Sequence, residues 1–508
     1  MVAVKVNMPI TLVEMRNIVK YFPGVLANDH INFTAWKGEI HGLLGENGAG
    51  KTTLMNILYG LYQPDQGEIY FEGKRVIIQA PQDAIRLGIG MVHQHFMLIP
   101  RLTVAENIVL GLKSPREPFL AIREAEDRIQ QLSEEYGLKV NPRARVWELS
   151  VGEEQRVEIL KALYRNTKLL ILDEPTAVLT PQEVDRLFEA LSYIRKKGCT
   201  IIFISHKLKE VKEITDRVTV LRNGKVVATF ATTEVTEGQL AKLMVGRDIL
   251  LQVVNPPVEK GKRVLAVQDL SVYNDKGLEA VKKVSFSIHE GEILGLAGVS
   301  GNGQNELVEA LVGLRKVEKG RVWIYEKEIT NLSPRKILEQ GVGYIPEDRL
   351  KVGIAVSLSV AENLILRQYR HPEFSRGGFF RSEKIKSYAQ SLVDRFNIKT
   401  PSLDTPAGKL SGGNLQKLIL AREISQEPRL LIAVQPTRGL DVGATEYIQT
   451  QLLEQKQRGT AILLVSEDLE EIFALSDQIA VIYEGQIAGI VPTKEADREQ
   501  IGLMMAGG

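Results

Sequence analysis

The stretch Gly45-Glu46-Asn47-Gly48-Ala49-Gly50-Lys51-Thr52 decides the fold of this chain, because its pattern is Gly, four residues, then Gly-Lys-Thr. A short apolar run at 38–44 precedes it, and residues 53–59 follow with helical apolar spacing. Strand, glycine-rich turn and helix in this order predict a phosphate-binding loop, where backbone N–H groups and a helix N-terminus face an anion. Lys51 then reaches the terminal phosphates, and Thr52 binds Mg²⁺. A glycine turn that matches by chance is the alternative, and the flanking elements disfavour it.

Length and composition limit the classes of protein that this chain can belong to. Its 508 residues exceed a single core and predict two to four domains. A net charge of +1 leaves no basic excess to neutralise many phosphates, so we expect no nucleic acid partner. Cys199 is the only cysteine, which excludes internal disulfides and cysteine-rich metal centres and fits a reducing compartment. There is no run of about 18 apolar residues and no signal-peptide pattern near the start, so we expect another chain to cross any membrane.

The sequence contains an internal repeat of domain length. The segment GEIHGLLG at 38–45 returns as GEILGLAG at 291–298, an offset of 253, and LSVG at 149–152 returns as LSGG at 410–413, an offset of 261. The second copy therefore has eight extra residues between these motifs. A period this long indicates duplication of a whole domain and not a solenoid. We predict a first domain at 1–250, a linker rich in Pro, Gly and charge at 251–262, and a second domain at 263–508.

Apolar runs within each copy predict an α/β fold. Residues 169–172 and 200–204 are continuous apolar stretches of strand length, typical of strands buried on both faces of a parallel sheet. Residues 67–71 and their counterpart 320–324 follow a glycine with β-forming residues and predict hairpin strands. The region 103–161 is mostly helical in pattern, which predicts a helical subdomain inserted into the α/β core.

Two adjacent carboxylates follow one of these predicted strands. Asp173 and Glu174 come directly after the run 169–172, and parallel sheets bind ligands at the carboxyl ends of their strands. We expect Asp173 to orient Mg²⁺ through water and Glu174 to polarise an attacking water. An acid pair before Pro175 is also typical of a simple strand exit, but the phosphate loop favours the metal site.

These motifs, in this order over nearly the whole chain, resemble those of the ATP-binding-cassette (ABC) ATPases. The resemblance implies an α/β fold of two tandem P-loop ABC ATPase domains, each with a mainly parallel sheet core, an antiparallel β subdomain and an inserted helical subdomain. It also implies that Gln94 contacts the metal and the attacking water, that His206 contacts the γ-phosphate, and that Phe22 stacks on adenine. For Phe22, a packing role in a core or turn stays open.

The resemblance further implies a site that both halves build. In this family two cassettes pair head to tail, and ATP lies between the phosphate loop of one and the signature sequence of the other. The signatures here are LSVGE at 149–153 and LSGGN at 410–414. For the intact site, with ATP and Mg²⁺, the resemblance assigns nucleotide contacts to Phe22, Gly45, Glu46, Asn47, Gly48, Ala49, Gly50, Lys51, Thr52, Thr53, Ser411, Gly412, Gly413 and Asp441, catalysis to Glu174, His206 and Gln94, and the metal to Thr52, Gln94 and Asp173.

The second copy has lost the chemistry of the first. Where the first copy has Lys51, Thr52, Gln94, Asp173, Glu174 and His206, the second has Gln304, Asn305, Glu347, Val434, Gln435 and Glu467. These exchanges remove the phosphate-facing charge, the hydroxyl ligand and the general base. The signature of the first copy is altered as well, and Thr180 stands where the second copy has Asp441. We infer one hydrolytic site and one degenerate site.

The degenerate second loop and the segment YIPEDR at 344–349 resemble the bacterial importers of ribose, galactose and nucleosides. Residues 431–441 are closer to the nucleoside branch. The resemblance implies transmembrane permease subunits and an extracytoplasmic solute-binding protein as partners, with this chain held peripherally at the cytoplasmic face of the membrane. One alternative is a ribosome-associated two-cassette protein, which typically keeps both loops and a long charged linker. Another is a nucleotide sensor without activity, which the intact Glu174 disfavours.

Overall fold

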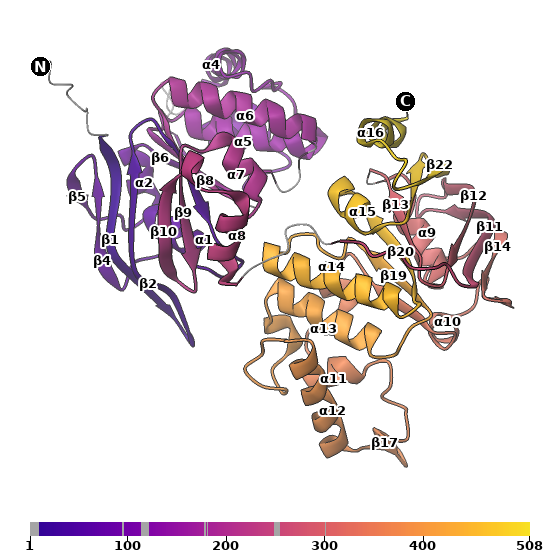
Figure 1. Cartoon of the computed structure of the whole chain (residues 1–508). Coiled ribbons are helices and arrows are strands. Elements are labelled where there is room, and N and C mark those ends of the chain that lie inside the picture. The colour runs from indigo at the N-terminus through magenta and orange to yellow at the C-terminus, as the bar shows by residue number, and fades with distance from the viewer. Residues whose placement is uncertain are drawn as a thin grey trace, which may run out of the picture. The chain divides into compact units, whose positions relative to one another are not determined.

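The computed structural model describes residues 10–93, 96–112, 121–176, 179, 181–247, 254–299 and 301–507. The chain divides into two compact units, Met1–Ile249 and Leu250–Gly508. Each unit has a mainly parallel sheet with helices, an antiparallel sheet and a helical subdomain (Figure 1). Within the described part of the chain, no helix is both long and apolar enough to span a membrane.

The first unit is built on two sheets. The larger has the strand order β10-β9-β3-β8-β7-β6, with all neighbours parallel except β10 and β9. The smaller is antiparallel, in the order β2-β1-β4-β5. The strands are β1 (Thr11–Phe22), β2 (Val25–Trp36), β3 (Ile40–Leu44), β4 (Gln66–Phe71), β5 (Lys74–Val76), β6 (Ile89–Val92), β7 (Leu169–Asp173), β8 (Thr200–Ile204), β9 (Arg217–Arg222) and β10 (Lys225–Ala231).

The helices of the first unit connect these strands, and α3 to α5 form the helical subdomain. They are α1 (Lys51–Leu58), α2 (Pro81–Leu87), α3 (Val104–Val109), α4 (Ile122–Glu135), α5 (Val151–Leu163), α6 (Pro181–Lys196), α7 (Leu208–Ile214) and α8 (Glu237–Val245), with short 3₁₀ turns at Val146–Glu148 and Thr232–Glu234.

The two main sheets of the second unit repeat this topology, and β17 and β18 form a separate two-stranded sheet. The parallel sheet of this unit has the order β16-β19-β20-β13-β21-β22, closed by the antiparallel pair β21 and β22, and its antiparallel sheet has the order β12-β11-β14-β15. The strands are β11 (Arg263–Tyr273), β12 (Glu279–His289), β13 (Ile293–Ala297), β14 (Lys319–Ile324), β15 (Lys327–Glu328), β16 (Val342–Ile345), β17 (Ser375–Arg376), β18 (Phe379–Phe380), β19 (Leu430–Val434), β20 (Ala461–Ser466), β21 (Gln478–Tyr483) and β22 (Gln486–Pro492).

The helices of the second unit follow the same plan, with α11 to α13 as its helical subdomain. They are α9 (Gln304–Leu311), α10 (Pro334–Leu338), α11 (Val360–Ile365), α12 (Ser382–Arg395), α13 (Gly412–Ile424), α14 (Val442–Gln457), α15 (Leu469–Leu475) and α16 (Arg498–Ala506), with a π-helical turn at Arg349–Gly353 and a 3₁₀ turn at Ala407–Lys409.

The pattern of buried residues explains why these runs are strands. Every residue of β3, β7 and β8 is buried, because helices cover one face of the sheet and the antiparallel sheet lies over the other. The expected strands at 169–172 and 200–204 are β7 and β8, and the helix expected after the phosphate loop is α1. The prediction of a parallel core is confirmed in both units.

The described part of the predicted linker, residues 254–262, packs on the second unit. The side-chain amide of Asn255 donates to the carbonyl of Leu475 at 3.0 Å. The ammonium group of Lys456, on α14, donates to Oδ1 of Asn255 at 2.6 Å and to the carbonyl of Pro256 at 3.0 Å. These residues therefore belong to the second unit, whose first strand begins at Arg263.

Candidate functional site

The phosphate loop of the first unit has a backbone that its glycines alone permit. Gly48 and Gly50 have φ angles of +81° and +97°, a region that other residues rarely enter. A Cβ added at Gly45 would lie 2.5 Å from the carbonyl oxygen of Leu221. With this backbone, N–H groups of the turn and of the first turn of α1 can face an anion. The loop therefore fits the phosphates of a nucleotide.

Lys51, the first residue of α1, places a buried positive charge at this loop. Its side chain is only 6% exposed, and its ammonium group donates to the carbonyl oxygens of Gly45 at 2.7 Å and of Glu46 at 3.0 Å. The carbonyls of the loop hold the ammonium group at the anion-binding turn. The expected role of Lys51 as a phosphate contact is compatible with this position and stays a prediction.

Thr52 and Asp173 meet although they are 121 residues apart in sequence. The hydroxyl of Thr52 donates to Oδ2 of Asp173 at 3.0 Å, and Asp173 is the last residue of β7. Burial raises the pKa of Asp173, the charge of Glu174 adds to this effect, and the Thr52 hydrogen bond and the charge of Lys51 oppose it. Hydroxyl and carboxylate oxygens are the ligands that Mg²⁺ prefers, so the chemistry of this pair fits a magnesium site.

Glu174 has a strained backbone and an ionised side chain. Its φ angle is +48°, and its N–H donates to the carbonyl of Ile204 on β8 at 3.0 Å. Its Oε1 lies 3.0 Å from Nδ1 of His206. Burial alone would raise the pKa of Glu174, but the hydrogen bond and charge of His206, with the charges of Lys51 and Lys207, outweigh it and lower the pKa. A carboxylate kept charged in this position can accept a proton from water.

A second carboxylate supports the segment that holds His206, and the sequence analysis missed it. Oε2 of Glu210 accepts a hydrogen bond from the hydroxyl of Thr176 at 2.5 Å, and Lys207 pairs with Oε1 at 3.0 Å. The hydroxyl of Ser205 accepts from the N–H of Lys207 at 3.0 Å. These contacts tie the turn after β8 to the turn after β7, and so fix His206 opposite Glu174. The internal repeat could have revealed Glu210, because Glu471 and Thr437 stand at the positions that match Glu210 and Thr176.

The second unit keeps the backbone of this site without its chemistry. Gly301 and Gly303 have φ angles of +91° and +99°, as in the first loop, but Gln304 occupies the position of the lysine. Gln435 repeats the strained backbone of Glu174 with a φ of +47° and an N–H bonded to the carbonyl of Val465 at 2.8 Å. Glu347 adds a carboxylate where the first unit has Gln94, and its ion pair with Arg438 offsets this charge.

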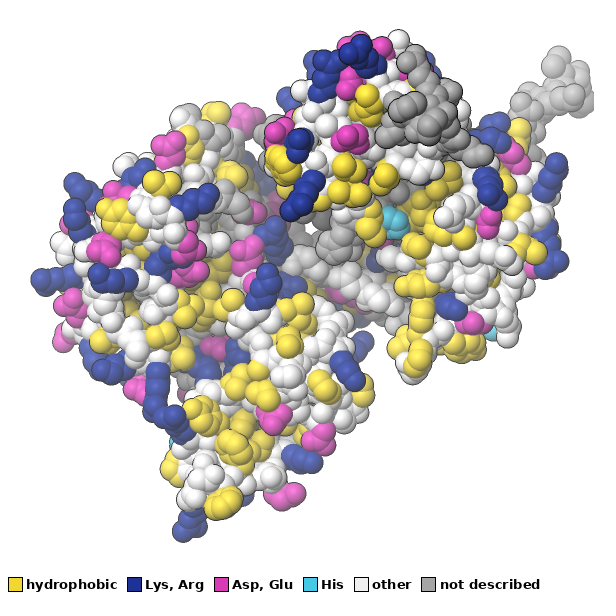
Figure 2. Space-filling model, turned by 180° about the vertical axis from the view of Figure 1, so that it is seen from behind, with side chains coloured by type: hydrophobic (Ala, Val, Ile, Leu, Met, Phe, Trp, Pro, Cys, Tyr) yellow, Lys and Arg dark blue, Asp and Glu magenta, His cyan; other side chains and the backbone are white. Residues whose placement is uncertain are grey.

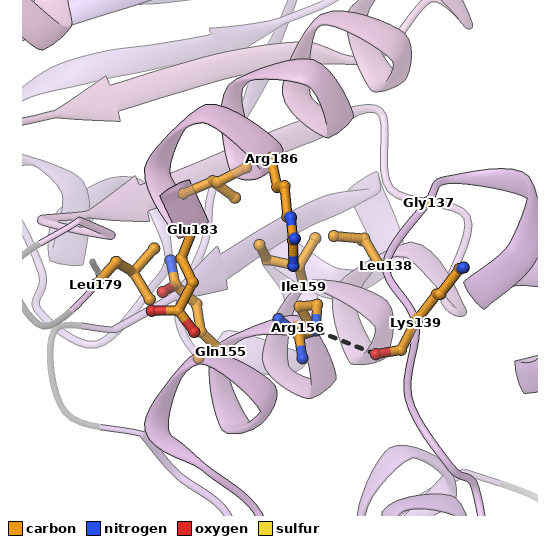
Figure 3. A pocket seen from close by; sticks show the side chains of 11 residues that line it. Gly137, Leu138, Lys139, Gln155, Arg156, Ile159, Leu179, Glu183 and Arg186 are labelled. Carbon is orange, nitrogen blue, oxygen red and sulfur yellow. Dashed lines mark hydrogen bonds between the residues drawn. The ribbon is translucent and has the colours of Figure 1, made fainter. Parts of the chain in front are cut away.

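Carboxylates surround the start of α5 in the first signature sequence. Ser150 caps this helix, and both its hydroxyl and its N–H donate to Oε2 of Glu153, at 3.0 and 2.9 Å. A Cβ added at Gly152 would lie 2.3 Å from Oε1 of Glu183 on α6, so this carboxylate lies against the backbone of the signature. Figure 3 shows Glu183 at the edge of a cavity of about 420 Å³ whose lining also includes Arg186. Two carboxylates beside this helix start make it a poor site for phosphate.

The second signature sequence differs in its polar contacts. The hydroxyl of Ser411, just before α13, accepts a hydrogen bond from the neutral amide of Asn414 at 2.9 Å. A Cβ at Gly413 would meet the Cβ of Ala444 at 3.3 Å, so the small residue lets α14 approach. Asp441 caps α14, with its Oδ1 accepting from the N–H of Ala444 at 2.8 Å. Ser411, Gly412, Gly413 and Asp441 therefore lie near one another within the second unit.

Gln94, expected at the metal and water, falls outside the described residues, and so does Thr180. Glu46, Asn47 and Ala49 lie in the phosphate loop, and Thr53 in the first turn of α1.

Phe22 is the last residue of β1, with its ring edge-to-face on Tyr62 at 5.3 Å and the ammonium of Lys20 at 5.6 Å. These contacts favour a packing role, and its contact with adenine stays a prediction.

Comparison with known proteins places the repeat in one family. The family model described as ABC transporter matches residues 28–177 and 281–438, which together are more than half of the chain. The chain is 50% identical to the glucose import ATP-binding protein TsgD13 of Haloferax volcanii, over 97% of this chain and 96% of that protein. It is 49% identical to the guanosine import ATP-binding protein NupO of Bacillus subtilis, over 98% and 97%. It is 47% identical to the nucleoside import ATP-binding protein NupA of Lactococcus lactis, over 98% of each chain.

Proposed function

We propose that this chain, which belongs to the ABC transporter family, is the ATP-hydrolysing subunit of a solute importer. The observation that best supports the proposal is the asymmetry of its two units. The first joins Thr52 to Asp173 and Glu174 to His206, while the second has no acid at either matching carboxylate position. Relatives named as import ATP-binding proteins match 97–98% of this chain, so the two-cassette arrangement is shared with them.

The geometry of the first unit suggests how hydrolysis proceeds. The phosphate loop binds the phosphates of ATP through its N–H groups, and the charge of Lys51 stabilises the negative charge on the transferred phosphoryl group. Glu174 is ionised and accepts a proton from the attacking water. Since an ionised carboxylate only accepts hydrogen bonds, Nδ1 of His206 carries the proton toward it, which leaves Nε2 to face the γ-phosphate. Thr52 and Asp173 would hold Mg²⁺, which would supply positive charge to neutralise the phosphates.

We propose that the competent site is completed by the second signature, through Ser411, Gly412, Gly413 and Asp441. The two signatures support this asymmetry, because the start of α13 has a neutral amide beside its serine where α5 has Glu153. Dipole and N–H groups at the start of α13 then act on the γ-phosphate without a carboxylate in the position of Glu153. ATP joins groups from both units, and its hydrolysis separates them, so the cycle can drive a partner that prefers one state.

The partners follow from the same reasoning. We propose that transmembrane permease subunits bind this chain, that a solute-binding protein delivers the solute outside the cell, and that this chain is peripheral at the cytoplasmic face. The solute is a nucleoside or a simple sugar, as in the names of the relatives. The likeness of residues 431–441 to the nucleoside branch favours a nucleoside.

Reconstitution tests this proposal. The chain is co-purified with the permease encoded beside it, placed in proteoliposomes with the binding protein, and assayed for uptake of labelled guanosine and glucose. We expect uptake that depends on ATP, that Lys51→Ala abolishes and that Gln304→Ala leaves within about twofold of the wild type. The proposal is wrong if the chain binds ribosomes instead of the permease, or if ATP drives no uptake of any tested nucleoside or sugar.

A further inference from the structure

A short β-hairpin extends from the helical subdomain of the second unit, between α11 and α12. Its strands β17 and β18 pair Ser375 with Phe380 and Arg376 with Phe379. Gly377 and Gly378 connect them with φ angles of +58° and +85°. Two central residues with positive φ are the requirement of a type I′ turn, whose twist matches that of the flanking strands. The hairpin therefore has a defined conformation.

The base of the hairpin is fixed to the core of the second unit. Phe374 is 1% exposed, belongs to the main hydrophobic core and lies 5.0 Å from the ring of Tyr388 on α12. The N–H of Arg381 donates to the carbonyl of Phe374 at 2.8 Å, which closes the hairpin, and the N–H of Ser375 donates to the carbonyl of His371 at 2.9 Å. The protein thus holds the tip in place on a buried aromatic anchor.

The two phenylalanines at the tip are exposed. The side chain of Phe379 is 81% exposed and that of Phe380 is 60% exposed. This exposure is unfavourable, because the free energy falls when an aromatic ring leaves water. Neighbouring residues of a strand point to opposite faces, so the tip has an aromatic ring on each face. A flat groove on a protein would cover one face only. A medium that surrounds the tip, such as the interface of a lipid bilayer, would cover both.

The charge around the tip is strongly positive. Arg370, Arg376 and Arg381 are exposed, and Lys384 and Lys386 follow on α12. The segment 370–386 has five basic and two acidic residues, a net charge of +3, while the whole chain has a net charge of +1. Hydrophobic and basic side chains gather at this end of the second unit, the lowest point of the view in Figure 2. Such a combination is typical of surfaces that bind anionic lipids.

We propose that this hairpin, residues 375–380 with its flanking arginines, is a direct contact site for anionic phospholipid. Phe379 and Phe380 enter the headgroup region, and Arg370, Arg376 and Arg381 pair with lipid phosphates. This contact goes beyond the proposed function, in which the chain reaches the membrane only through its permease. It would give the ATPase a second, weak attachment to the bilayer and limit its rotation there.

The test uses the full chain without its permease. Sedimentation with vesicles of phosphatidylcholine and 40% phosphatidylglycerol is compared with pure phosphatidylcholine vesicles, at low and high salt. We expect binding to the anionic vesicles that weakens with salt. The double variant Phe379→Ser/Phe380→Ser and the triple variant Arg370→Gln/Arg376→Gln/Arg381→Gln should each lose at least about tenfold in vesicle affinity. In a Phe379→Trp variant, the fluorescence of the introduced tryptophan should be quenched by bromine-labelled lipid.

Matched controls separate this contact from a general attraction of charge. The triple variant Lys319→Gln/Arg321→Gln/Lys327→Gln removes three exposed cations of β14 and β15 and should keep wild-type vesicle binding. The thermal midpoint and ATPase rate of each variant verify its fold. Equal binding to both vesicle types, or unchanged binding by the phenylalanine variant, overturns the proposal. So does a phenylalanine variant that binds vesicles normally but no longer co-purifies with permease, because the tip then contacts a protein.

Discussion

Nδ1 of His206 lies 3.0 Å from Oε1 of Glu174, and the matching positions of the second unit hold Glu467 and Gln435. The backbone at both sites is the same, since Glu174 and Gln435 have φ angles of +48° and +47°. The second unit therefore keeps this strained backbone conformation at a position that carries an amide and not a carboxylate. Each site can serve as the control for the other, because the same substitution can be made at two positions that have the same backbone geometry.

Replacing the carboxylate of Glu174 should stop hydrolysis. We expect Glu174→Gln to lower steady-state ATP hydrolysis by about 10²-fold to 10⁴-fold, because the amide cannot accept the proton of water. Nucleotide binding should persist, since the phosphate loop is unchanged. Gln435→Ala is the control and should leave the rate within about twofold, as no base is lost there. Phosphate release from ATP measures both, and equal losses in the two variants would contradict the asymmetry.

The hydroxyl of Thr52 should be needed for magnesium. We expect Thr52→Val to raise the Mg²⁺ concentration for half-maximal ATPase by about tenfold or more, because the metal loses an oxygen ligand and Asp173 loses its hydrogen bond. Thr52→Ser keeps the hydroxyl and should stay close to the wild type. Asn305→Val is the matched change in the second unit. A Mg²⁺ titration that is the same for Thr52→Val and Thr52→Ser would contradict this role.

A single tightly bound nucleotide per chain is expected. The second phosphate loop keeps its glycine conformations but has Gln304 in place of the lysine, and the first signature has Glu153 and Glu183 close to its helix start. Missing and opposing charges both weaken phosphate binding. Equilibrium binding of a slowly hydrolysed ATP analogue, counted per chain, measures this. Two equally tight sites would show that the backbone N–H groups of Gly301 and Gly303 suffice.

The sequence predicted the repeat and the strands around each phosphate loop, because glycine spacing and apolar runs are local signals. It did not predict Glu183 against Gly152, since that contact joins α6 to α5 and no pattern marks it. It also did not predict that Arg438 offsets the charge of Glu347. Such contacts depend on how elements pack, and a sequence of one chain has no record of packing between distant positions.

Stability should depend on pH through one buried carboxyl group of the second unit. Glu471, on α15, is 3% exposed and accepts a hydrogen bond from Thr437 at 2.7 Å, and burial raises its pKa to about 7. Its counterpart Glu210 is ion-paired with Lys207, but Asp468 stands in that place here. A pKa raised on folding stabilises the protein below the unfolded pKa, near 4.3, and this contribution is lost as pH rises through 7.

We therefore expect Glu471→Gln to increase the stability of the second unit at pH 7.5 relative to the wild type. Between pH 4.5 and 7.5, the free energy of unfolding of the variant should fall by on the order of 3 kcal/mol less than that of the wild type. Urea unfolding across this range measures the difference. Glu210→Gln is the control, and it should lower stability slightly at pH 7.5 because it breaks the ion pair with Lys207. Parallel pH curves for the wild type and Glu471→Gln would contradict the prediction.

The attachment of the linker to the second unit should depend on Lys456. Its fully buried ammonium group pairs with Asp477 at 2.6 Å and also binds Asn255 and Pro256 of the linker. The matching pair of the first unit, Arg195 and Asp216, is about 35% and 41% exposed.

Breaking a buried pair costs about 3 kcal/mol or more, and an exposed pair contributes about 1 kcal/mol or less. Lys456→Met should therefore destabilise the second unit and release residues 254–261 to proteases, while Arg195→Met should do neither. Limited proteolysis with mass mapping of the fragments, beside urea unfolding, measures both effects. Similar cleavage rates in the two variants would show that the linker is held by its other contacts, such as the Asn255 amide on Leu475.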